Sequence, residues 1–162
     1  MKEARNVESF SLDHTRVVAP YVRLAGIKSG PHGDTVSKFD IRFCQPNECY
    51  MGTAGMHTLE HLMAEYIRDE IDGVIDLSPM GCRTGFYLSV FGEPGEKEIA
   101  DRVRATLVRV ASWQDTEEVP GVDPVMCGNW QDHDLAEAKT WARKWIEGID
   151  RKGFQAMPTL TL

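Results

Sequence analysis

Two histidines and a glutamate near the middle of the chain have the spacing of a metal site. His57 and His61 are four residues apart with Glu60 between them, so on a helix all three side chains project from one face within about one turn. Two imidazoles at this spacing can bind one divalent metal ion, and a carboxylate beside the ion can move protons for a bound water or substrate. The pattern predicts a metal centre with an acid/base residue next to it.

Cys127 is the favoured third metal ligand. It precedes Gly128 in an irregular segment, from which a thiolate can reach a metal ion, although the spacing does not separate this role from that of a core thiol. A distant carboxylate such as Glu137 is the alternative, because HxxEH is also the motif of one class of zinc peptidases.

Cys82 is a second thiol that could take part in chemistry. It lies in a glycine-containing turn between two short predicted strands, where substrate can reach it and where Arg83 can help to hold a thiolate. The alternative is a turn cysteine without a role. For Cys44 and Cys49, which flank a loop, we expect no role.

Composition narrows the function class. The chain has 162 residues, of which 42% are hydrophobic and 27% are charged, and it carries a formal net charge of −7. This balance gives no electrostatic reason to approach nucleic acid or an anionic membrane. No apolar run in the sequence has the length or place of a secretory signal or of a membrane-spanning helix. We therefore expect a cytoplasmic protein with reduced thiols.

The hydrophobic pattern predicts an α+β fold in one domain, residues 1–162, with a loosely ordered tail at 152–162. The β-branched and aromatic residues of the chain favour a strand at 17–27, and alternation favours a half-buried strand at 35–43. Residues 73–77 and 86–91 are two further short strand candidates. Helical periodicity favours helices at 56–71 and 95–112 and a third one after Asp132. We expect the helices to pack on one face of a largely antiparallel sheet.

Six stretches between Val7 and Leu135 share their order and spacing with one known family. They are Ser9–Thr15, Ala19–Arg23, Asp40–Asn47, His57–Leu62, Asp76–Gly85 and Cys127–Asn129. On these stretches the chain resembles the LuxS family of S-ribosylhomocysteine lyases. The amino-acid sequence of the loop at 48–56 differs from that expected for the family.

The resemblance implies a homodimeric α+β carbon–sulfur lyase with two metal sites near the subunit interface. Such an enzyme cleaves S-ribosylhomocysteine into homocysteine and 4,5-dihydroxy-2,3-pentanedione, the precursor of the quorum-sensing signal autoinducer-2. The implied cofactor is iron(II), one per subunit, for which zinc or cobalt can substitute, with a water as fourth ligand.

The resemblance also implies roles for nine residues. The metal ligands would be His57, His61 and Cys127, and the acid/base pair would be Glu60 and Cys82. The substrate pocket would be lined by Ser9, His14, Arg42 and Asp76.

Two other functions remain open from the residues alone. A zinc peptidase built on His57, Glu60 and His61 would hydrolyse a peptide and would not need Cys82. A non-catalytic metal-binding module would have a closed shell of four ligands and no bound water.

Overall fold

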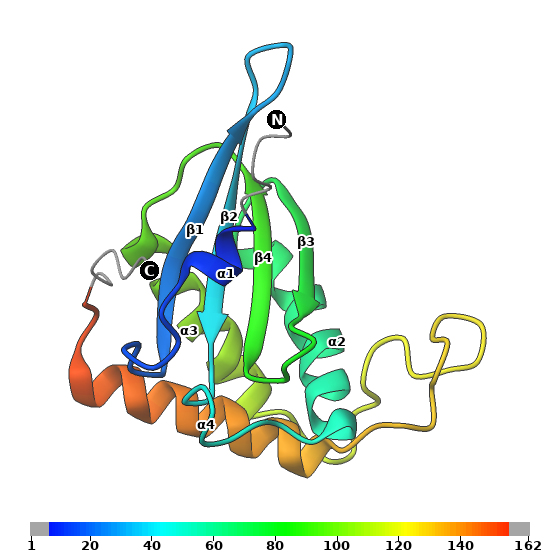
Figure 1. Ribbon diagram of the computed structural model, residues 1–162. Coiled ribbons are helices and arrows are strands. Elements are labelled where there is room, and N and C mark those ends of the chain that lie inside the picture. Colours follow the sequence, from blue (N-terminus) through cyan, green and yellow to red (C-terminus); the bar gives the residue numbers. More distant parts are fainter. Residues whose placement is uncertain (1–6, 156–162) are drawn as a thin grey trace.

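The computed structural model describes residues 7–155, and its centre is one antiparallel sheet of four strands. The strands are β1 (Tyr21–Ser29), β2 (Thr35–Arg42), β3 (Val74–Pro79) and β4 (Gly85–Phe91). They lie side by side in the order β1-β2-β4-β3 (Figure 1). All four predicted strands are confirmed, although β1 begins only after Pro20.

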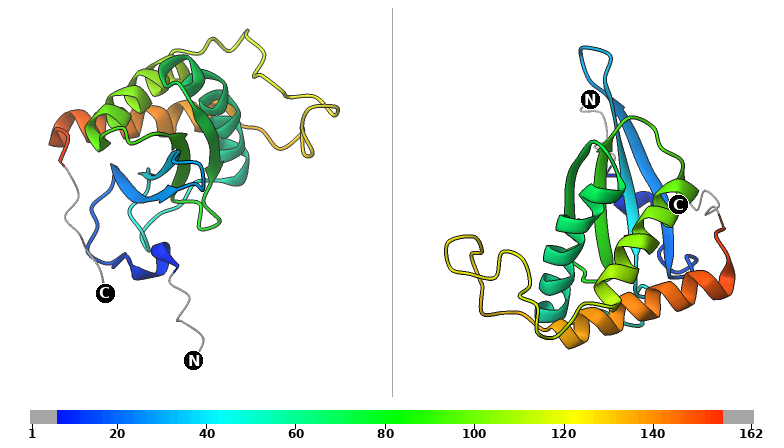
Figure 2. Two further views of the ribbon diagram at one scale, coloured as in Figure 1. Left: turned by 90° about the horizontal axis from the view of Figure 1, so that it is seen from above. Right: turned by 180° about the vertical axis from the view of Figure 1, so that it is seen from behind.

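The three long helices cover one face of this sheet. They are α2 (Thr53–Glu70), α3 (Glu96–Ala111) and α4 (Leu135–Lys152), and a short helix, α1 (Glu8–Ser11), lies over the opposite face (Figure 2). The sequence did not predict α1. The α+β fold with helices on one face is confirmed, and no helix in the described part of the chain is long and apolar enough to cross a membrane.

The core lies between the sheet and the long helices because the apolar side chains of both point into this layer. On β2, Phe39 and Ile41 are fully buried against it. The other face of β2 was expected to meet solvent, but Asp40 and Arg42 are buried too. These two side chains pair with each other, which satisfies their charges.

The third predicted helix also lies in this core. The indole of Trp145 is 1% exposed and donates a hydrogen bond to the Arg42 carbonyl over 3.0 Å. Helix α4 ends at Lys152, the first residue of the predicted tail, and the part of that tail from 156 to 162 lies outside the described residues.

Candidate metal centre

Four side chains meet where the first half of α2 approaches the segment that leads into α4. One ligand atom from each lies within 4.8 Å of the others, and the four residues are His57, His61, Cys127 and His133. The Cys127 sulfur is 3.3 Å from Nε2 of His57. The three metal ligands predicted from the sequence thus lie together, and they are joined by a fourth residue that was not predicted.

Backbone carbonyls fix the two helical histidines in the orientation that a metal needs. Nδ1 of His57 lies 2.9 Å from the Asp132 carbonyl oxygen, and Nδ1 of His61 lies 2.7 Å from that of Pro120. Because a carbonyl oxygen only accepts, the ring proton of each histidine belongs on Nδ1. Each Nε2 therefore keeps a free lone pair, as in metal-bound histidines whose other nitrogen is hydrogen-bonded.

His133 is held in the same way by a hydroxyl group. Its Nδ1 is 3.1 Å from Oγ1 of Thr58, which donates to the Ala54 carbonyl and accepts from the Asp134 amide. The remaining lone pair of Oγ1 can accept the Nδ1 proton of His133. Nε2 of His133 is buried and has no hydrogen-bond partner in the described part of the chain.

The electrostatics keep His133 neutral. Burial, and then the neighbouring His57 and His61, lower its pKa to about 4. Its ring stacks on that of His57, with centroids 4.0 Å apart and planes 24° apart. A neutral, unsatisfied nitrogen beside three other nitrogen and sulfur donors fits a borderline or soft divalent ion such as zinc, iron(II) or cobalt(II) rather than magnesium or calcium.

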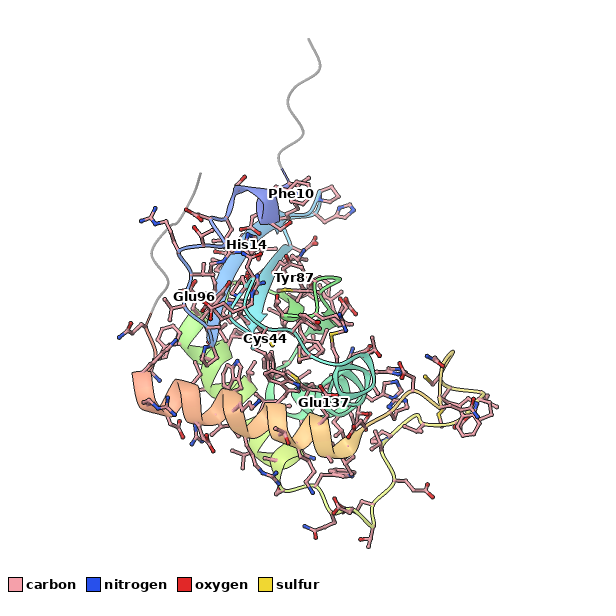
Figure 3. All side chains as sticks on the ribbon, turned by 60° about the horizontal axis from the view of Figure 1, so that its bottom comes forward. Phe10, His14, Cys44, Tyr87, Glu96 and Glu137 are labelled. Carbon is pink, nitrogen blue, oxygen red and sulfur yellow. The ribbon has the colours of Figure 1, made fainter. Side chains whose placement is uncertain are left out.

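Glu137, the alternative third ligand, has another role. Its Oε1 accepts hydrogen bonds from the Gly52 amide over 2.8 Å and from the Trp141 indole over 3.0 Å. Figure 3 shows its side chain where α4 meets the start of α2. Glu137 therefore fastens two helices together and is not part of the metal cluster.

Glu60 lies on α2 directly before His61. Its side chain is half-buried, and no hydrogen bond or ion pair with a described residue engages its carboxylate. The carboxylate is therefore free to accept a proton from a substrate that approaches the two helical histidines.

A cavity of about 300 Å³ lies beside Cys82. Its walls include three of the predicted site residues, His14, Arg42 and Cys82, together with Thr84 and Cys49. The sulfur of Cys82 is 3.0 Å from Oγ1 of Thr84. The structure thus brings the predicted acid/base thiol together with two of the predicted substrate residues.

Arg42 is the buried cation of this cavity. Nε and Nη2 donate to the two carboxylate oxygens of Asp40, over 3.1 and 2.7 Å. Burial opposes the charged form, but the hydrogen bonds and the charge of Asp40 outweigh it and raise the pKa of Arg42 above its ordinary value. Arg42 is therefore a permanent positive charge in a fixed position.

Ser9 and Asp76 do not line this cavity. Ser9 hydrogen-bonds with Tyr87 of β4, and Asp76, exposed on β3, accepts a hydrogen bond from Ser78 over 2.8 Å. Figure 3 shows Tyr87 and His14 on the same side of the molecule, away from α4.

The turn that carries Cys82 is tied to the segment before α2. The Met51 amide donates to the Arg83 carbonyl over 2.9 Å, and the Arg83 guanidinium donates to the Met51 carbonyl over 3.3 Å. The guanidinium also lies over the ring of Tyr50. Among the described contacts, Arg83 does not reach the Cys82 sulfur, and Thr84 holds that position.

Comparison with known proteins gives one family. Residues 7–155 match the family model described as S-Ribosylhomocysteinase (LuxS). The S-ribosylhomocysteine lyase of Deinococcus radiodurans is 49% identical over 162 residues, which cover 100% of this chain and 99% of the relative. That of Pediococcus pentosaceus is 51% identical, covering 92% and 96%, and that of Streptococcus suis is 48% identical, covering 98% and 99%.

Proposed function

The chain belongs to the LuxS family of S-ribosylhomocysteinases, and from this premise we propose that it cleaves the carbon–sulfur bond of S-ribosylhomocysteine. The observation that carries the proposal is the meeting of His57, His61 and Cys127 in one cluster within a chain that matches the family over residues 7–155. The products are homocysteine and 4,5-dihydroxy-2,3-pentanedione.

The reaction requires two shifts of a carbonyl group before the bond can break. The open-chain sugar has its carbonyl at C1, too far from the C5–S bond to acidify the neighbouring carbon. In each shift a base removes the proton next to the carbonyl, and a proton is returned to the former carbonyl carbon, so the carbonyl moves to C2 and then to C3. Removal of the C4 proton then expels the homocysteine thiolate, and the resulting enol relaxes to the diketone.

We assign the proton transfers to Glu60 and Cys82. Glu60 follows His57 by three residues on α2, so it can serve the carbon atoms next to the metal centre. Cys82 comes from a different turn and reaches the substrate from another direction. Two groups on separate elements suit a proton that leaves one carbon and arrives at the next, and one such group typically contributes about 10²–10⁴-fold in rate.

We assign the metal to His57, His61 and Cys127 and propose iron(II), one per subunit, with zinc or cobalt as substitutes. When bound there, the ion supplies Lewis acidity to the oxygen atoms of the sugar chain. His133 lies outside this assignment because the ligand set implied by the resemblance to the family is His57, His61 and Cys127 with a water, although its ring stacks on that of His57 within the same cluster.

We propose that Arg42 and His14, which line the cavity beside Cys82, bind the substrate. Ser9 and Asp76 are proposed as further substrate residues on the resemblance to the family alone. We also propose a cytoplasmic homodimer with its sites near the subunit interface, and a product that serves as precursor of autoinducer-2.

The peptidase alternative is not favoured. A peptidase of the HxxEH type takes a carboxylate as third ligand, but here the third donor is a thiol and Glu137 is occupied elsewhere. It also gives no reason for Arg42 and Thr84 to surround Cys82.

Incubation of the metal-loaded protein with S-ribosylhomocysteine tests the proposal. We expect free thiol to appear in proportion to the substrate consumed, and no cleavage of a mixture of unstructured peptides. Peptide cleavage without thiol release would establish the peptidase function instead. If a protein with full metal content showed neither activity, the result would point to a non-catalytic metal-binding module.

A further inference from the structure

We propose that Thr84 is a positioning residue for Cys82. Its hydroxyl group donates a hydrogen bond to the Cys82 sulfur, and the buried Arg42, which donates to the same hydroxyl group, strengthens that bond. The inference rests on the proposed role of Cys82 in proton transfer. It concerns a residue for which the sequence pattern indicated no role.

The position of Thr84 is fixed by its backbone. The residue stands directly before β4 and is 6% exposed. Its carbonyl oxygen accepts hydrogen bonds from the amides of Phe43 and Cys44, over 2.9 and 3.0 Å. A backbone held twice by the segment after β2 leaves the hydroxyl group little freedom to move.

The direction of the first hydrogen bond follows from the chemistry of the partners. Nη1 of Arg42 lies 2.6 Å from Oγ1 of Thr84, and a guanidinium can only donate, so Thr84 accepts from Arg42. The Cys82 sulfur lies 3.0 Å from the same Oγ1. When Cys82 is a thiolate, which can only accept, Thr84 is the donor to its sulfur.

Arg42 is itself anchored, and this makes the chain of contacts rigid. Its Nε and Nη2 are both bound to Asp40, so Nη1 is the corner of the guanidinium that faces Thr84. Asp40 also accepts a hydrogen bond from Tyr21 over 3.1 Å. In a buried network each hydrogen bond polarises the next, so the cation strengthens the hydroxyl of Thr84 as a donor.

Two consequences follow for Cys82. Its side chain is exposed and would otherwise be free to rotate, but the bond to Thr84 fixes the sulfur at the wall of the cavity. A hydrogen bond to a charged acceptor is also stronger than one to a neutral acceptor, so the bond holds the sulfur most firmly when the sulfur carries a charge. Thr84 therefore aims the sulfur and holds it in place.

The test compares Thr84→Val, which keeps the shape of the side chain but lacks the hydroxyl, with Thr84→Ser, which keeps the hydroxyl. The readout is the rate at which iodoacetamide alkylates Cys82 in the substrate-free, metal-loaded protein, followed by mass spectrometry of the peptide that contains it. Cys49 is exposed in the same molecule and serves as the internal control. Metal content and thermal unfolding are measured for each variant.

We expect alkylation of Cys82 in Thr84→Val to be about tenfold slower at neutral pH, the size expected from a lost hydrogen bond to a charged group. Cys49 should be unaffected, and Thr84→Ser should stay close to the wild-type rate because it keeps the hydroxyl group. If Thr84→Val does not fold, Thr84→Ala removes the same hydroxyl and should show the same direction of change.

If Cys82 were alkylated at the wild-type rate in a folded variant without the hydroxyl group, the inference would be overturned. Thr84 would then be only a hydrogen-bond partner for Arg42. The result is separate from the proposed function, because alkylation requires neither the substrate nor turnover. A protein that shows the Thr84 effect but releases no thiol from S-ribosylhomocysteine would retain this inference and lose the proposed activity.

Discussion

The two imidazoles proposed as metal ligands each use one nitrogen for the protein and leave the other for the metal. For both His57 and His61 the protein partner is a backbone carbonyl. Such contacts set the tautomer and the ring orientation, which commonly changes metal affinity by about 10–100-fold. The loops that supply these carbonyls are therefore part of the metal site.

Replacement of Cys127 by alanine should remove most of the bound metal. The thiolate is the only sulfur donor in the four-residue cluster, and its loss leaves nitrogen ligands alone. Metal content after gel filtration, measured by atomic emission, is the readout, and Cys49→Ala is the matched control because that thiol is exposed and outside the cluster. Full metal content in Cys127→Ala would remove this residue from the ligand set.

The histidines differ in how far the sequence could reveal them. His57 and His61 could be predicted because both belong to one helix, whose geometry converts a spacing of four residues into a shared face. His133 could not be predicted, since it meets them only where α4 docks on α2 through the Asp134 amide and Thr58. The one local signal was its place directly before Asp134, a residue typical of helix starts.

Helix α4 begins with a side-chain cap that also lies next to the metal cluster. The Asp134 carboxylate accepts a hydrogen bond from the Glu137 amide over 2.8 Å. Asp134→Ala should lower the free energy of unfolding by about 1 kcal/mol, as expected for loss of an N-cap. Urea denaturation of the metal-free protein measures this, with Asp134→Asn as the control because asparagine caps equally well. Equal losses in both variants would show that the negative charge matters, not the cap.

The start of helix α2 could not be placed from the sequence. Helix α2 begins three residues before the predicted start, because the Glu137 carboxylate on α4 binds the Gly52 amide. A Cβ on Gly55 would come within 2.5 Å of the same carboxyl group, so a larger residue there would displace the Glu137 side chain from this helix contact. Periodicity identified both helices, but the boundary depends on a contact between residues 85 positions apart.

The surface leaves several large apolar side chains in solvent. Phe10, Val125 and Met126 are 78%, 93% and 69% exposed. Figures 1 and 2 show that the segment between α3 and α4, which carries Val125 and Met126, extends away from the body of the molecule. Exposed apolar residues grouped on a projecting loop are typical of a surface that another chain covers.

Sedimentation at micromolar concentration should therefore give a species of twice the 18.2 kDa chain mass. Met126→Glu should shift the equilibrium toward monomer, because a charge would be placed in the covered surface. Val108→Glu is a control on the outer side of α3, where the side chain is 43% exposed. A wild-type protein that sediments as a single 18.2 kDa species would contradict the homodimer.

The most direct measurement is thiol release from S-ribosylhomocysteine by metal-loaded Glu60→Gln and Cys82→Ala, compared with the wild-type protein. Both variants should keep their metal and lose at least about a hundredfold in rate, because each lacks one of the two groups that move protons. Loss of metal in Glu60→Gln would make that residue a ligand instead. Wild-type rates in either variant, with metal content unchanged, would contradict the assignment of proton transfer to Glu60 and Cys82.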